Sequence, residues 1–134
     1  MSVAALLQAA AVARLRASPV LAPAGVFDAP PVRAALPHAV VDEPLLTDWS
    51  TKSWAGREAR LAVSVYDMAE RPVRLRTLAA AVEEALLSLG GELGDGWRIA
   101  SVAPVRSRVV RGAERWTASI EVRVRLYQSN EGDE

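Results

Sequence analysis

The clearest pattern of apolar and polar positions spans residues 57–89, where an alternating segment leads into one of helical period. Over residues 59–66, apolar side chains alternate with polar or small ones, which predicts a strand with one buried face. Beyond Pro72, apolar residues recur at spacings of three and four, which predicts an amphipathic helix. Its apolar stripe consists of Leu75, Leu78, Val82, Leu86 and Leu89. Asp67 and Glu70 supply carboxylates near the helix start, and a Gly-Gly pair predicts its end.

A first helix is predicted over residues 2–17, where Ser2 can cap its N-terminus. The Ser18-Pro19 step ends this helix, since the residue before proline is disfavoured in the helical region. Residues 19–37 are rich in proline and predict an irregular connection with a short extended piece at residues 26–27.

Three further strands are predicted. Residues 38–46 form the first, and Pro44 indicates that its end lies at a sheet edge. Residues 97–110 form the second, with a bulge or bend near Pro104. Residues 115–127 form the last, which alternates most clearly. Its inward positions are Trp116, Ala118, Ile120, Val122, Val124 and Leu126.

The order of elements predicts an α+β fold of two layers, in which two helices cover one face of a four-stranded antiparallel sheet. The chain of 134 residues forms a single domain, and residues 127–134 form a flexible acidic tail. The other sheet face is polar and consists of Glu58, Arg60, Ser64, Arg115, Thr117, Glu121, Arg123 and Arg125.

Composition narrows the classes of function. Sixteen basic and sixteen acidic side chains give a formal net charge of zero, which argues against attraction of the whole molecule to nucleic acid or anionic lipid. The chain has no cysteine, which excludes disulfides, thiolate metal sites and a cysteine nucleophile. No apolar stretch approaches the roughly 18 residues of a membrane span. We expect a soluble protein that is made inside the cell and has no membrane partner.

The sequence offers little for catalysis. His38 is the only histidine, and no nucleophile motif accompanies it. Neighbouring acidic residues such as Asp42 and Glu43 point to different faces of a strand and do not form a carboxylate dyad. The glycine-rich segment 90–96 follows a helix, whereas phosphate-binding loops follow a strand. We therefore predict no enzymatic activity, no metal and no cofactor.

A cluster of basic residues near the C-terminus is a candidate for a binding surface. Glu114 and Glu121 are its only acidic neighbours within residues 106–127. Three interpretations remain open: a solvated sheet face, a small nucleic-acid-binding module, or a protein interface, where arginine is enriched. The cluster consists of Arg106, Arg108, Arg111, Arg115, Arg123 and Arg125.

The polar loop at residues 47–56 contains Trp49 and Trp54. Either these side chains fold back onto the sheet edge, as large apolar residues usually do, or they anchor a contact with a partner.

Several segments together resemble the tail-completion (tail-terminator) family of long-tailed bacteriophages and related gene transfer agents. These are ALLQAAAVARLRA near the start, PHAVVDEPLLTDWSTKSWAGREARLAVSVYD in the middle, the RLRTLAAAVEEAL helix and the C-terminal SVAPVRSRVVRGAERWTASIEVRVRL. The resemblance implies an α+β subunit of a hexameric ring that caps the tail tube, contacts head-completion proteins and leaves a channel for DNA. It implies no enzymatic role and no cofactor.

The resemblance also implies a place at the head–tail junction of a particle assembled in the bacterial cytoplasm, with loop 47–56 and strand 57–67 as assembly elements. DNA would pass without sequence-specific binding. A ring requires a head-to-tail contact between two different patches, which the basic region 106–125 and the acidic residues 42–43 and 131–134 can provide. The predicted interface residues are Trp49, Lys52, Trp54, Arg57, Arg60, Arg115, Glu121, Arg123 and Arg125.

Overall fold

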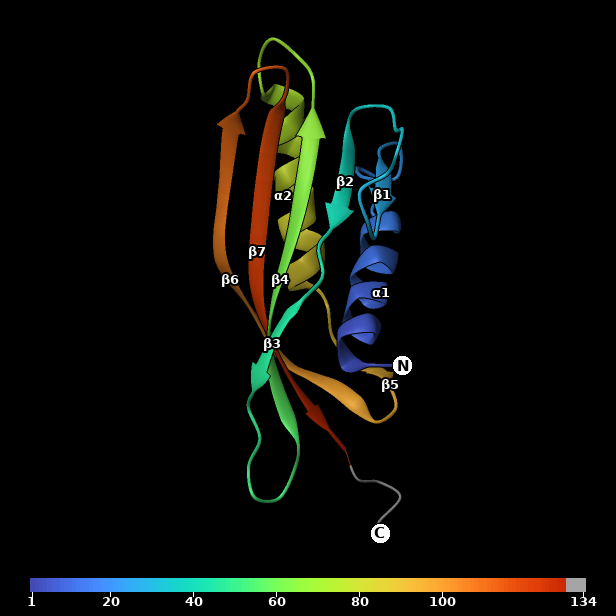
Figure 1. The fold of residues 1–134 in the computed structure, drawn as a ribbon, viewed down its shortest axis with the longest axis vertical. Coiled ribbons are helices and arrows are strands. Elements are labelled where there is room, and N and C mark those ends of the chain that lie inside the picture. Colours follow the sequence, from blue (N-terminus) through green and yellow to red (C-terminus); the bar gives the residue numbers. More distant parts are fainter. Residues whose placement is uncertain (130–134) are drawn as a thin grey trace.

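The computed structural model describes residues 1–129 (Figure 1). Residues 130–134, which hold most of the predicted acidic tail, lie outside the described residues. The elements in chain order are α1 (Val3–Arg16), β1 (Gly25–Phe27), β2 (His38–Val41), β3 (Leu45–Asp48), β4 (Gly56–Asp67), α2 (Val73–Leu87), β5 (Glu92–Gly94), β6 (Trp97–Arg111) and β7 (Trp116–Gln128). Tyr127 and Gln128, which open the segment predicted as a tail, therefore belong to a strand.

All strands of the described residues form one seven-stranded sheet in the order β1-β2-β4-β7-β6-β5, with β3 also paired to β4. The mixed α+β class is confirmed, but the prediction of four strands is wrong. The predicted strand 38–46 is split into β2 and β3, and Pro44, which cannot donate to a ladder, lies in the break. The sheet is also not wholly antiparallel, because β1 pairs with β2 in parallel.

The core lies between the helices and one face of the curled sheet. All twelve residues of β4 pair with β7, and the predicted alternation is confirmed on both strands. Both helices bury side chains in this core, and Leu7, Leu15, Leu75 and Leu86 are fully buried. The buried sheet positions are Ala59, Leu61, Val63 and Val65 of β4 and Ala118, Ile120, Val122, Val124 and Leu126 of β7.

Helix α1 lies beside β1 and β2, and two polar side chains hold it there (Figure 1). Ser2 caps its N-terminus as predicted, by accepting a hydrogen bond from the amide of Ala5. The side-chain nitrogen Nε2 of Gln8 donates to the backbone carbonyl oxygens of Asp28 and Val41, at 3.0 and 3.1 Å. Arg16 donates to the carbonyl oxygen of Val26 at 2.7 Å. These bonds fix the proline-rich connection to the helix that precedes it.

Two irregularities in β6 agree with the predicted bend. The register with β7 shifts between Ile99 and Ser101 and again between Pro104 and Arg106. A strand bends and twists where such a shift leaves a residue unpaired. The glycine-rich segment 90–96 after α2 contains β5, a strand of three residues that pairs with the start of β6.

Candidate functional site

The sheet face opposite the helices carries a strip of ion pairs across β4, β7 and β6. Glu121 of β7 lies between Arg106 of β6, whose Nε is 2.8 Å from its carboxylate, and Arg60 of β4, at 3.5 Å. On the same face, Glu58 accepts a hydrogen bond from Nε of Arg125 at 2.9 Å. This strip joins β4 to the consecutive strands β6 and β7, which follow it in the chain beyond α2.

Each of the two carboxylates in the strip is shared by two arginines. The hydrogen bond from Arg106, with a smaller contribution from Arg60, lowers the pKa of Glu121 below its usual value. Glu58 already pairs with Arg125. Nε of Arg123 lies 3.9 Å from the carboxylate of Glu58 and has no hydrogen-bond partner within residues 1–129. Sequence analysis missed Glu58 as a counter-ion, because it lies 67 residues before Arg125.

This pairing does not favour the nucleic-acid-binding interpretation. Arginines held by carboxylates of their own chain are less available to neutralise phosphates, on which non-specific binding depends. The strip comprises Glu58, Arg60, Arg106, Glu121, Arg123 and Arg125, and one aromatic ring lies beside it, since the guanidinium of Arg125 is 5.3 Å from the ring centroid of Trp49.

The structure separates two other predicted interface residues from the strip. Arg57 is paired with the inward-facing Leu126, so its exposed side chain lies on the helix side of the sheet, beyond the core. Arg115 precedes β7, and its guanidinium lies 4.3 Å from the ring centroid of Tyr66. Arg115 is therefore on the polar face but near the opposite end of the molecule from Arg57.

The loop between β3 and β4 forms a hairpin at one end of the molecule (Figure 1). The rings of Trp49 and Trp54 pack edge to face with centroids 5.3 Å apart, and Trp54 also contacts Tyr127 at 5.9 Å. Both tryptophans are half-buried and Lys52 between them is exposed. The two indoles therefore pack against each other, and Trp54 packs against Tyr127 of β7, while part of each tryptophan remains exposed.

Gly56 allows this packing. A Cβ atom at this position would lie 2.3 Å from the carbonyl oxygen of Trp49 and 2.5 Å from the ring of Trp54. The amide of Gly56 also donates to Oγ of Ser50 at 3.0 Å, and its carbonyl accepts from the amide of Trp49 at 2.9 Å. The loop can close only because no side chain occupies this position.

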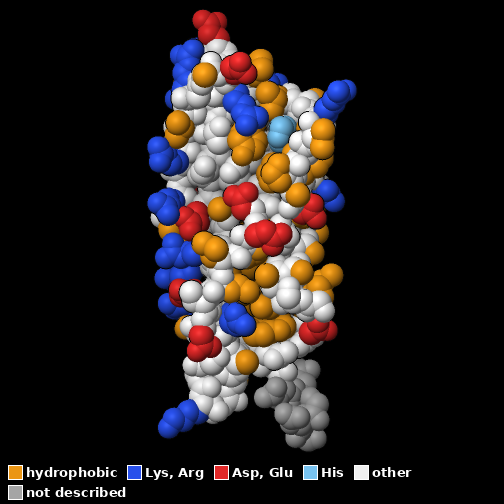
Figure 2. Space-filling model, viewed as in Figure 1, with side chains coloured by type: hydrophobic (Ala, Val, Ile, Leu, Met, Phe, Trp, Pro, Cys, Tyr) orange, Lys and Arg blue, Asp and Glu red, His pale blue; other side chains and the backbone are white. Residues whose placement is uncertain are grey.

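Basic side chains gather along one side of the molecule. Figure 2 shows Lys and Arg along the side where β6 lies. On this strand the arginines are Arg98, Arg106, Arg108 and Arg111. Acidic residues Asp42 and Glu43 lie on the other side of the sheet, in the break between β2 and β3. Residues 131–134, the other part of the predicted acidic region, lie outside the described residues.

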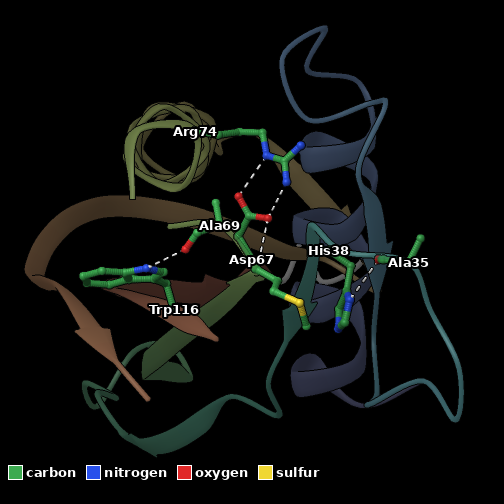
Figure 3. A network of polar contacts seen from close by, with 7 residues as sticks. Ala35, His38, Asp67, Ala69, Arg74 and Trp116 are labelled. Atoms are coloured by element: carbon green, nitrogen blue, oxygen red, sulfur yellow. Dashed lines mark hydrogen bonds and ion pairs between the residues drawn. The ribbon is translucent and has the colours of Figure 1, made fainter. Parts of the chain in front are cut away.

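At the end of the molecule opposite the β3–β4 hairpin, a polar network fixes the turn between β4 and α2 (Figure 3). The buried carboxylate of Asp67 accepts hydrogen bonds from Nε of Arg74 at 2.9 Å and from the amide of Met68 at 2.8 Å. The Arg74 pairing lowers the pKa of Asp67 in spite of burial. The indole nitrogen of Trp116 donates to the carbonyl of Ala69 at 3.1 Å. Asp67 thus orients Arg74 and does not cap the helix.

His38 is a packing residue in this structure. Its ring is buried between Phe27 and Tyr66, and Nδ1 lies 3.3 Å from the carbonyl oxygen of Ala35 (Figure 3). Within residues 1–129, no group of three or more His, Asp or Glu side chains is arranged to hold a metal ion. Neither described helix is long and apolar enough to cross a membrane.

Comparison with known proteins identifies the class. The model of the family described as "Tail completion protein gp17" matches residues 3–129. A chain in the solved structure "Virion of native gene transfer agent (GTA) particle" is 30% identical, with a TM-score of 0.83, over 94% of this chain and 98% of that chain. No curated protein matches the chain.

These similarities define a structural protein of a virion. The chain belongs to the tail completion protein gp17 family, since the match covers nearly all of its length. The resemblance inferred from the sequence is thereby confirmed.

We predict that Gly56→Ala lowers the free energy of unfolding by about 1–3 kcal/mol, because the added methyl group overpacks the hairpin. Urea denaturation followed by tryptophan fluorescence measures this change. Gly90→Ala is the matched control, since a Cβ at that position meets nothing within 4 Å. Equal midpoints for the two variants would contradict the packing described for Gly56.

We predict that Asp67→Asn destabilises the protein by about 2 kcal/mol at neutral pH, through loss of a charged hydrogen-bond acceptor. Because folding lowers the pKa of Asp67, its carboxylate stabilises the fold at pH values above its unfolded-state pKa, near 3.8. This stabilisation is lost as the pH falls through the folded-state pKa. Denaturation at several pH values should show the two proteins converging in acid. Glu70→Gln, an exposed change in the same turn, should have little effect; a constant difference at every pH would refute the ionic contribution.

Proposed function

We propose that this chain is the tail terminator of a phage or gene transfer agent particle. Six copies form a ring that caps the completed tail tube, contacts head-completion proteins and leaves a central channel for DNA. The observation that supports this best is the family match over residues 3–129, together with the similarity to a chain of a gene transfer agent virion. The particle is assembled in the bacterial cytoplasm, and the ring lies at its head–tail junction.

The distribution of polar and aromatic groups supports a ring. A closed ring uses a heterologous contact, in which two different patches of each subunit meet. The hairpin between β3 and β4, called the tryptophan hairpin below, offers Trp49, Lys52, Trp54 and Arg57 at one end of the molecule. Tryptophan and arginine are frequent at energetically important contacts. The ion-paired strip offers Arg60, Glu121, Arg123 and Arg125, and Arg115 lies beyond it on the same face.

The proposed passage of DNA requires a channel that does not hold the duplex tightly. Each phosphate that a basic side chain neutralises adds to affinity and to its salt dependence. The chain has a formal net charge of zero, and its strip arginines already contact Glu58 and Glu121. These features suit a conduit without sequence-specific binding.

We predict that the purified protein sediments as a hexamer, or binds to the end of isolated tail tubes as a ring in electron micrographs. Particles produced without the gene should carry tails of uncontrolled length, because nothing stops tube growth. A protein that stays monomeric and binds no tail end would refute the proposal.

A further inference from the structure

A small pocket lies where the proline-rich connection meets the polar face of the sheet. The register of β2 with β4 pairs His38 with Tyr66, and both side chains point to this face. The pocket has a volume of about 280 Å³. Its lining comes from the segment 30–36, from His38 and Val40 of β2, from Tyr66 of β4 and from Arg115. Figure 2 shows the histidine next to hydrophobic side chains.

The size of the pocket limits its ligand. Sites for drug-sized molecules usually enclose about 300–1,000 Å³, so this pocket suits a single side chain. Its wall is largely apolar, since the segment 30–36 contributes Pro30, Pro31, Val32, Ala34 and Leu36. A ligand with a short hydrocarbon part and one polar group therefore matches the lining.

Arg115 is the only charged residue among those that line the pocket. Its side chain forms no ion pair and no hydrogen bond within residues 1–129, whereas Arg60 and Arg125 on the same face lie 3.5 and 2.9 Å from a carboxylate oxygen. The charge of Arg115 is thus the one on this face that the described chain leaves uncompensated inside a pocket. A carboxylate supplied by a ligand would compensate it.

Tyr66 holds the guanidinium of Arg115 in place. The carbon atom Cζ of Arg115 lies 4.3 Å from the centroid of the Tyr66 ring, a cation–π contact. A side chain that is already ordered loses less conformational freedom when a ligand binds, which favours affinity. The N–H groups at the edge of the planar guanidinium remain available, and their spacing matches the two oxygens of a carboxylate.

We propose that this pocket binds the side chain of an acidic residue of a partner protein. The carboxylate pairs with Arg115, and the methylene groups of the ligand contact the proline-rich wall and the ring of Tyr66. This site goes beyond the proposed ring and does not require it, because the pocket is complete within one copy of the chain.

The acidic residue can come from a second copy of this chain or from another protein of the particle. Glu114 is the candidate within this chain, since it is exposed and forms no ion pair within residues 1–129. It lies in the turn between β6 and β7, where Trp116 pairs with Asp67, and is therefore close to the level of Tyr66 along the strands. A rotation about an axis along the strands keeps this level.

His38 reports on the pocket, because it is the only histidine of the chain and part of the lining. The full-length protein is titrated with N-acetylglutamate N-methylamide while NMR follows the imidazole resonances of His38. These resonances should shift saturably. The uncharged N-acetylglutamine N-methylamide, which has nearly the same shape, should show a Kd at least about fivefold higher, because it lacks the charge that pairs with Arg115.

Two arginine variants test the assignment. Arg115→Gln should remove the difference between the two probes. Arg111→Gln is the matched control in the same hairpin and should retain the difference, since Arg111 stacks on Trp116 and does not line this pocket. Thermal unfolding establishes that each variant folds.

Glu114→Gln identifies the source of the natural carboxylate. If a second copy fills the pocket, this variant should bind the glutamate probe more tightly than the natural protein does; if another protein fills it, the two affinities should agree. Equal Kd values for the two probes in both the natural protein and Glu114→Gln would overturn the carboxylate pocket, whatever the state of assembly. Selective binding by a protein that forms no ring would leave the pocket standing while the proposed function fails.

Discussion

The pairing of β4 with β7 is the interaction on which the rest of the structure depends. The two strands remain in register along the whole of β4, so every inward residue contributes to one core and every outward residue to one polar face. Burial of five inward residues of β7 without measurable exposure leaves no space for a shifted register. A slip of one residue would turn the charged strip into the helices.

Both ends of this strand pair hold a second structural feature. Where β4 begins, Gly56 lets the tryptophan hairpin close against Tyr127. Where β4 ends, Asp67 fixes Arg74 and thereby the first turn of α2. Because a single strand carries both features, the hairpin and the start of α2 are held at a fixed separation.

Sequence patterns were sufficient to predict the type and the buried face of the long elements, for physical reasons. Strands β4 and β7 alternate over many residues, and α2 repeats an apolar stripe, so their type and buried face can be read directly. The three-residue β5 is too short to show any period. The break between β2 and β3 did leave a signal, since Asp42, Glu43 and Pro44 are all poor strand formers. The partner of Glu58 was also beyond reach, since strand order, not sequence separation, brings it to Arg125.

The attachment of α1 has a consequence for how freely the chain can vary. Gln8 and Arg16 bind main-chain oxygens, which every amino acid possesses, and touch no side chain of the proline-rich connection through these bonds. Related proteins can therefore exchange the residues that supply those oxygens while α1 keeps its position beside the sheet. The exposed connection can then adapt to new neighbours.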